Sequence, residues 1–295
     1  MPATSPWPAD RVPFPVTAPF RMRPGLQRLG GSLGTLLAPD DGARSSAQAV
    51  EQAIARQRLP VLGAPGDETI APALIEAARL QIVQALDEHK GVAAGQAAAS
   101  GGRAREQIIA LRRSVQDDLV LMAAAPDGPR GGMLRASVLA VAMPSGWDPQ
   151  TKLGQDFQQI HAPVADAEQL RAAAQPLSAA LLTRPFCRYV WTLSNSPALS
   201  AHPADRQADP QTDRAHYWRD LWFRSERQIT VPLPGAIGVL FLIRVFVAPL
   251  PAVLAVAPAR APLLVQALQT MSPAVQAYKG LTRWRGLVLE ALASA

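Results

Sequence analysis

The sequence predicts an α+β protein built around a mainly antiparallel sheet, and three observations carry this prediction. Two runs rich in Val, Ile and Phe lie within residues 224–247, joined by the turn signal Leu-Pro-Gly at 233–235, which indicates a buried hairpin. Other short apolar runs bounded by turn residues precede this hairpin. Segments with helical periodicity stand before, between and after the runs, so helices should flank the sheet and be inserted into it.

The first third of the chain favours helices behind an extended arm. Residues 1–24 are rich in proline with few periodic apolar positions, which indicates an arm that is draped over the body or unfolded. Glycines at 30–34 and small residues at 91–102 are typical of loops. Helical spacing is clearest where apolar residues recur in steps of four, at Leu74, Ala78, Ile82 and Leu86. The helices expected here span 45–58, 68–90 and 105–116.

The rest of the chain alternates strand and helix signals. A polar loop at 194–213 is long enough to suggest a lid or a partner surface. Pro176 should kink or end the helix in which it lies. Strands are expected at 118–124, 137–143 and 186–193, ahead of the hairpin. Helices are expected at 166–182, 213–223, 259–271 and 273–292.

Composition excludes several classes of function. The net charge is +6, yet the arginines are scattered and only 5% of residues are aromatic, which argues against binding nucleic acid. The most apolar stretch, 237–256, is interrupted by Arg244, Pro249 and Pro251, so it does not predict a membrane-spanning helix. The N-terminus lacks the pattern of a signal peptide, and Cys187 is the one cysteine. We therefore expect a cytoplasmic protein without disulfides or a zinc site.

His161 is the first candidate for chemistry. A neutral imidazole is a common ligand for metals and haem, but from the residues alone a buried histidine bonded to backbone is the favoured interpretation. Pro163 follows closely and ends any helix there. The remaining histidines, His89, His202 and His216, lie in polar stretches and should face solvent.

A charged cluster enters the predicted hairpin at Arg224, Glu226, Arg227 and Gln228. Strand alternation puts Glu226 and Gln228 on one face of the sheet and Arg227 on the other. Arginine suits a carboxylate, and a glutamate can hold an ammonium group or act as a base. Because an unpaired buried charge is costly, the cluster either pairs internally or holds something bound.

Two further residues have open interpretations. Lys279 is one of three lysines and is followed by Gly280, which fits a helix C-cap, so it is either a functional cation or a solvated residue at a helix end. Cys187 lacks glycine-rich surroundings and is interpreted as a small apolar residue rather than a haem thiolate. Dinucleotide, P-loop, serine-hydrolase and His-Glu-x-x-His motifs are absent, so chemistry here would need a cofactor.

Taken in order, several segments resemble the haem-dependent oxidative N-demethylase α-subunit-like family. The resemblance runs through nearly the whole chain and is weakest over 30–110. The matching segments are Pro19-Phe20 with Gly25-Leu26, Asp117-Asp118-Leu119-Val120-Leu121-Met122, Pro144-x-Gly146-Trp147, Lys152-x-Gly154 leading to Ile160-His161-Ala162-Pro163-Val164, Arg224-x-Glu226-Arg227-Gln228, and Tyr278-Lys279-Gly280-Leu281.

The resemblance implies a PAS-like core at about 117–250 within one domain, 25–295, that binds haem b. It implies oxidation of a small secondary amine by dioxygen to formaldehyde and a primary amine. Electrons would come from NADPH through a separate flavin/iron–sulfur reductase subunit, and a tetrahydrofolate-dependent subunit could take the formaldehyde. The chain should bind neither nucleic acid nor membrane.

Residue roles follow from the motif positions together with chemical reasoning. His161 becomes the candidate axial iron ligand, and Glu226 and Arg224 the catalytic candidates, with Glu226 for the substrate ammonium. Where the family has Arg-x-Asn-Trp, this chain has Val190, which removes an amide from the expected pocket. The other candidates for holding the cofactor are Arg188, Trp191, Arg227, Gln228 and Lys279.

Three functions remain open at this point. The first is the haem-dependent oxidoreductase subunit. The second is a haem or small-ligand sensor on the same PAS-like scaffold, because a fold does not decide a function. The third is an interaction module that has lost haem, for which Val190 is the supporting departure.

Overall fold

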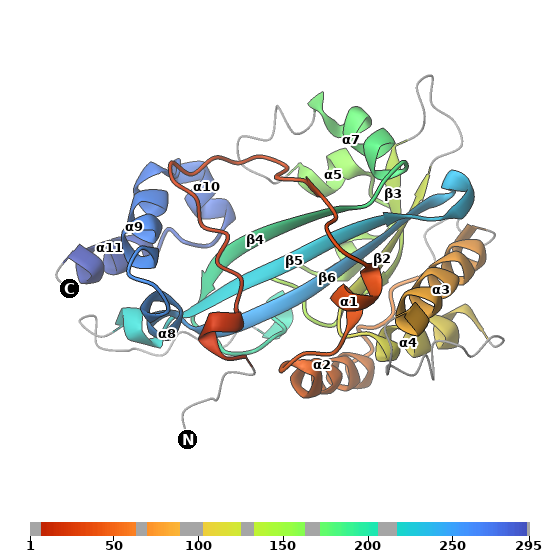
Figure 1. The fold of residues 1–295 in the computed structure, drawn as a ribbon, viewed down its shortest axis with the longest axis horizontal. Coiled ribbons are helices and arrows are strands. Elements are labelled where there is room, and N and C mark those ends of the chain that lie inside the picture. The colour runs from red at the N-terminus through yellow and green to blue at the C-terminus, as the bar shows by residue number, and fades with distance from the viewer. Residues whose placement is uncertain are drawn as a thin grey trace.

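The computed structural model describes residues 7–62, 70–88, 103–124, 133–162, 172–205 and 217–293. Six antiparallel strands form one sheet in the order β1-β4-β5-β6-β2-β3, with helices packed around it, so the α+β prediction is confirmed (Figure 1). The strands are β1 (Gln27–Arg28), β2 (Asp118–Ala124), β3 (Leu134–Ala140), β4 (Phe186–Ser194), β5 (Trp222–Pro232) and β6 (Gly238–Pro249).

The predicted hairpin is formed by β5 and β6, which pair from Trp222 opposite Pro249 to Pro232 opposite Val239. A 3₁₀ turn, Pro234–Ala236, closes it, and Gly235 there has φ of 71°, a conformation that favours glycine. Both strands are buried along nearly their whole length. The long β-branched and aromatic runs are therefore the centre of the sheet.

One strand and one helix differ from expectation. β3 begins at Leu134 and ends at Ala140, earlier than the expected 137–143, because Ala142 and Met143 leave the ladder and donate their backbone N–H groups to the Asp118 carboxylate. The helix expected at 213–223 is wrong over its described part. Only a 3₁₀ turn at Tyr217–Asp220 forms, because Trp222 already pairs with β4 and β6.

The described helices flank both sides of the sheet. The segment expected as one helix at 273–292 is two, since Gly280, with φ of 67°, ends the first of them, as a C-cap should. Pro176 lies in the first turn of its helix, where proline is tolerated, and so neither kinks nor ends it. The helices are α1 (Leu33–Leu37), α2 (Ala43–Ala55), α3 (Ile70–Glu88), α4 (Ala104–Ser114), α5 (Phe157–His161), α7 (Ala174–Leu181), α8 (Leu250–Ala255), α9 (Arg260–Thr270), α10 (Pro273–Tyr278) and α11 (Arg285–Ala293).

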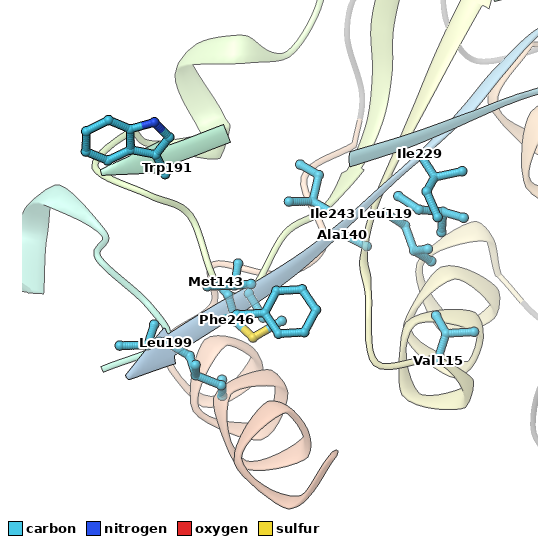
Figure 2. Close-up of a cluster of buried hydrophobic side chains, with 14 of the residues drawn as sticks. Val115, Leu119, Ala140, Met143, Trp191, Leu199, Ile229, Ile243 and Phe246 are labelled. Atoms are coloured by element: carbon cyan, nitrogen blue, oxygen red, sulfur yellow. The ribbon is translucent and has the colours of Figure 1, made fainter. Parts of the chain in front are cut away.

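The two faces of the sheet carry different clusters. The larger one, part of which Figure 2 shows, includes Leu119, Ile229 and Trp191 and continues into α3 and α4. We call this side the core face. The opposite side, which we call the site face, carries a smaller cluster that includes Val120 and receives side chains from α5 and α7. Alternation along the strands decides which face most of these side chains reach, but the larger cluster also includes Ile243, Val245 and Val247, which lie opposite Gln228, Glu226 and Arg224.

The described part of the N-terminal arm lies against the body. Trp7, Val12 and Val16 are buried in the large cluster, and the Trp7 indole donates a hydrogen bond to Asp40 Oδ1 at 2.9 Å. Figure 1 shows this segment in red, crossing the sheet and then returning to α1. The arm thus covers apolar surface that the helices leave open.

Candidate functional site

The register of β4 and β5 gathers the polar candidates on the site face. Arg188 lies opposite Gln228, Val190 opposite Glu226, and Thr192 opposite Arg224. Residues directly opposite each other in an antiparallel pair share a face. The prediction that Glu226 and Gln228 point the same way is confirmed, since the Gln228 amide donates to Glu226 Oε2 at 2.6 Å.

These side chains form one continuous hydrogen-bonded network. The Arg188 Nε donates to Gln228 Oε1 at 2.6 Å, and Gln228 donates to Glu226. The Ser145 hydroxyl donates to the other oxygen of Glu226, and the Arg224 Nε donates to Ser145 Oγ at 2.7 Å. Both carboxylate oxygens of Glu226 therefore have a neutral donor, and an arginine stands at each end of the network.

Ser145 is the member of this network that sequence reasoning missed. It occupies the variable position of the segment Pro144-x-Gly146-Trp147, in which only the flanking residues carry the family resemblance. Its backbone forms a bridge to Ala201, which fixes the turn beneath β5. Ser145 could have been predicted only as a small polar residue inside a turn motif.

Arg224 is 2% exposed and is bonded mainly to backbone carbonyls. Its guanidinium donates to the carbonyls of Ala198 at 3.0 Å, Met143 at 3.2 Å and Leu199. Burial lowers its pKa to about 10, against the opposing charge of Glu226, so it stays protonated at neutral pH. These contacts favour a role in holding the surrounding loops over a role in contacting a substrate.

His161 ends α5 and is neutral at physiological pH. Burial lowers its pKa to about 4, and the charges of Arg188 and Lys152 act in the same direction, while a backbone hydrogen bond opposes the shift. Its Nδ1 lies 2.7 Å from the Phe157 carbonyl oxygen, so the neutral ring carries its proton there. No described residue provides a hydrogen-bond partner for Nε2. The ring packs on Phe157 with centroids 4.1 Å apart.

Lys279 lies beside β4, on the side away from β5. Its ammonium donates to the Trp191 carbonyl and stands 5.1 Å from the Trp191 ring centroid and 5.5 Å from that of Phe20. Burial lowers its pKa to about 8, although Glu226 acts against this shift. Burial also raises the pKa of the neighbouring Tyr278 phenol. Both residues are within electrostatic reach of Arg188 and Glu226.

Two candidates lie on the other side of the sheet. Arg227 points to the core face, where it donates to the Leu36 carbonyl at 2.6 Å and lies 3.4 Å from Asp117 Oδ1. The Trp191 ring also belongs to the core face and stacks on Phe223 with centroids 5.9 Å apart. The sheet therefore separates both side chains from Glu226 and Gln228.

The remaining sequence candidates are placed as follows. His202 is 8% exposed, so the expectation that it faces solvent is wrong: its Nδ1 accepts from the Ala204 N–H, and its Nε2 lies 3.4 Å from Asp148 Oδ1. His89 and His216 fall outside the described residues. Cys187 is half-buried, and burial raises the pKa of its thiol, which disfavours a thiolate.

The described residues enclose two small cavities away from the network. One cavity of about 140 Å³ lies between α2 and α4, and one of about 20 Å³ lies beside Arg58 and His202. Neither is lined by His161 or Glu226. No described group of three or more His, Cys, Asp or Glu side chains could hold a bare metal ion. Within the same residues, no helix is long and apolar enough to cross a membrane.

The fold and site define an α+β protein whose sheet carries a buried acid–amide–guanidinium network on one face, beside a neutral histidine. The chain matches the family model described as haem-dependent oxidative N-demethylase, alpha subunit-like, over residues 87–289, and it belongs to this family. Five of the six segments that carried the resemblance fall within that match. A search of the curated proteins found none significantly similar to the chain.

Proposed function

We propose that this protein is the haem-binding subunit of an oxidoreductase that N-demethylates a small secondary amine with dioxygen. The observation that carries the proposal is His161, a neutral imidazole with its Nδ1 proton engaged by Phe157 and no described partner at Nε2. This is the state in which a histidine could hold haem iron through Nε2. The family description, which names a haem-dependent alpha subunit, supports the same assignment.

The chemistry of the surrounding side chains fits haem b. Haem would bring most of the iron's ligands with it, so His161 alone would be enough to hold the group although the described residues offer no larger ligand cluster. Arg188 is the cation nearest in the network to His161 and suits a propionate carboxylate. Lys279 offers a second cation at the edge of β4. Arg227 and Trp191, on the core face, would support the site through the sheet and would not contact the haem.

Glu226 is the proposed binding group for the substrate ammonium. Its two oxygens accept from Gln228 and Ser145, which fixes the carboxylate plane and keeps lone pairs for a further donor. Arg224, through Ser145, is a positioning residue. When bound, haem supplies the activation of dioxygen, and this chain binds and orients the amine. In the overall reaction, amine, dioxygen, two electrons and two protons give the primary amine, formaldehyde and water.

The electrons would come from partner proteins, which the alpha-subunit description of the family implies. We propose a separate flavin/iron–sulfur reductase subunit fed by NADPH and a tetrahydrofolate-dependent subunit that takes up formaldehyde. The described residues of this chain hold no cluster of ligands for an iron–sulfur centre.

A second candidate function rests on a specific observation. The polar groups of the site face pair largely with one another, from Arg188 to Arg224, and Val190 stands where the family has an amide. A network that is satisfied internally suits an interaction module that has lost its cofactor. Only the free Nε2 of His161 separates the two interpretations within the described contacts.

The test is the absorption spectrum of protein expressed with haem supplementation, recorded oxidised and then reduced under carbon monoxide. We expect a stoichiometric Soret band that shifts with carbon monoxide in the wild type and is lost in His161→Ala. Added imidazole should restore the band in His161→Ala, because it replaces the missing ligand. His202→Ala, which removes a histidine elsewhere, should keep the spectrum.

Three outcomes decide between the functions. A wild-type protein that stays colourless with added haemin removes the demethylase proposal and leaves the interaction module. A Soret band that is unchanged in His161→Ala assigns the iron to another ligand and overturns the site. A haem-loaded protein that fails to oxidise any secondary amine, while carbon monoxide alters its binding to a partner, would be a sensor.

A further inference from the structure

The N-terminal arm lines the outer edge of β4 and is held at three points, one on α9 and two on β4. The Phe20 N–H donates to Thr270 Oγ1 at 2.8 Å, and the Pro24 carbonyl accepts from Arg188 at 3.3 Å. Gln27 and Arg28 then form β1, paired with the start of β4. Figure 1 shows this red segment running from beside α10 towards α5. Its path is thus fixed along the edge of the candidate site.

Alternation along this segment turns its arginines outward. Phe20, Met22 and Leu26 pack inward against the two hydrophobic clusters. The residues that are exposed and have no side-chain partner within the described contacts are Arg21, Arg23, Arg28 and Arg184, and we call these four the basic edge. Arg184 joins the other three because β1 continues into a hydrogen bond from the Leu29 N–H to the Pro185 carbonyl.

The sequence stretches that supply most of the described surroundings of the basic edge lack acidic residues. Residues 11–39, 171–204 and 227–289 contain no Asp or Glu, and these stretches supply the arm, β4, β6 and helices α8 to α10. The exposed acids lie elsewhere, among them Glu51 on α2 and Glu76 on α3. The net charge of +6 is therefore unevenly spread, and a positive field extends from this edge.

The basic edge adjoins the candidate site and has the composition of an interface. Arg188 bonds to the arm through Pro24, and Lys279 lies over the Phe20 ring. Two tyrosines are unusually exposed beside it, Tyr189 on β4 at 41% and Tyr278 at the end of α10 at 49%. Arginine and tyrosine are enriched where proteins bind one another.

We propose that the basic edge docks an acidic surface of the protein that delivers electrons to this subunit. The proposal rests on the proposed function, which requires such a partner close to the site. Charge complementarity raises association rates and orients the partner. An anionic membrane is the weaker occupant, because surface-bound helices insert a continuous apolar face, and this edge offers two tyrosines only.

The test uses a reduced, acidic [2Fe–2S] ferredoxin as the probe and measures its Kd at low ionic strength. We expect Arg23→Glu and Arg28→Glu each to weaken binding about five- to tenfold, and rising salt to weaken wild-type binding. Arg44→Glu, an exposed arginine on α2 without a described partner, is the matched control and should change Kd less than about twofold. Arg184→Glu tests the same surface without altering the arm.

Binding is measured with and without haem, so a protein that fails the Soret test can still pass this one. A wild-type protein that does not bind the ferredoxin overturns the proposal. Equal weakening in Arg23→Glu and Arg44→Glu also overturns it, since only net charge would then matter. A third measurement uses phosphatidylserine vesicles. If Arg23→Glu and Arg184→Glu lose vesicle binding but keep ferredoxin binding, the basic edge faces a membrane and the proposal is overturned.

Discussion

At the residue scale, the polar atoms of the site differ in whether they have hydrogen-bond partners. Glu226 is 8% exposed yet costs little to bury, because Ser145 and Gln228 each donate to one of its oxygens. His161 is different, since its Nε2 has no partner among the described residues. A partly buried imidazole in this state resists protonation, and this property can be measured without any cofactor.

The first prediction concerns the stability of the haem-free protein at acid pH. The folded pKa of His161 is about 4, below the ordinary value of 6.5, so the unfolded chain binds more protons between these values. The contribution of neutral His161 to the free energy of unfolding is fully present above pH 6.5 and is lost as pH falls towards 4. Allowing for partial exposure, we expect wild type to lose about 1 kcal/mol more than His161→Gln between pH 7 and pH 5.

Urea unfolding at both pH values measures this difference. Parallel loss of stability in wild type and His161→Gln would contradict the shifted pKa. Because the same carboxylates titrate in both proteins, their contribution to the change in stability cancels in this comparison.

At the scale of elements, a buried ion network ties α1 to the sheet. Asp117 is fully buried and accepts from Arg244 at 2.6 and 3.0 Å and from Arg227 at 3.4 Å. Arg244 also donates to the Leu37 and Ala38 carbonyls, which are otherwise unsatisfied at the end of α1. The arginines of β5 and β6 on the core face are thus structural, while those on the site face border the candidate site.

The second prediction follows from this network. Asp117→Asn leaves the Arg227 guanidinium without its acidic partner and Arg244 with Asp40 alone, and should lower the free energy of unfolding by about 3 kcal/mol. Arg113→Ala breaks the exposed pair with Glu51 on α2 and should cost less than about 1 kcal/mol. Chemical denaturation of the two variants provides the measurement, and similar losses would show that the buried network is not a stabilising feature.

At the scale of the whole molecule, the arm completes the fold. The chain crosses the core face with Trp7 buried to 2% and its ring tilted against that of Phe246, then lines the edge of β4 before α1 begins. The same segment therefore closes the hydrophobic core and presents the basic edge. Trp7, Val12 and Val16 pack into the core, and the exposed arginines of the basic edge follow them along the same segment.

The third prediction tests whether the arm belongs to the folded body. Trp7→Ala removes a large buried side chain and should destabilise the protein by about 3–5 kcal/mol in thermal or urea unfolding. Thr17→Ala, at an exposed position of the same arm, should change stability by less than about 0.5 kcal/mol. Wild-type stability in Trp7→Ala would mean that the arm contributes nothing to the core.

The sequence by itself determined the fold class, the hairpin and the facing of Glu226, Gln228 and Arg227, because these depend on local periodicity and turn chemistry. It also determined the family, because the motif residues stand in order along the chain. The helix predicted over 213–223 was wrong in its described part. This segment has helical spacing, but pairing of Trp222 with β4 and β6 outweighs that weak preference once the sheet forms.

Only the tertiary structure decided which of the candidates meet. Residues 145, 188 and 226 are far apart in the chain, and the register of β4 on β5 with the turn at Ser145 joins them. Tertiary packing also placed the Trp191 ring in the core-face cluster, buried His202, and laid the arm along the edge of the candidate site. Contacts between distant segments carry no periodic signal, so no reading of local pattern could have placed them.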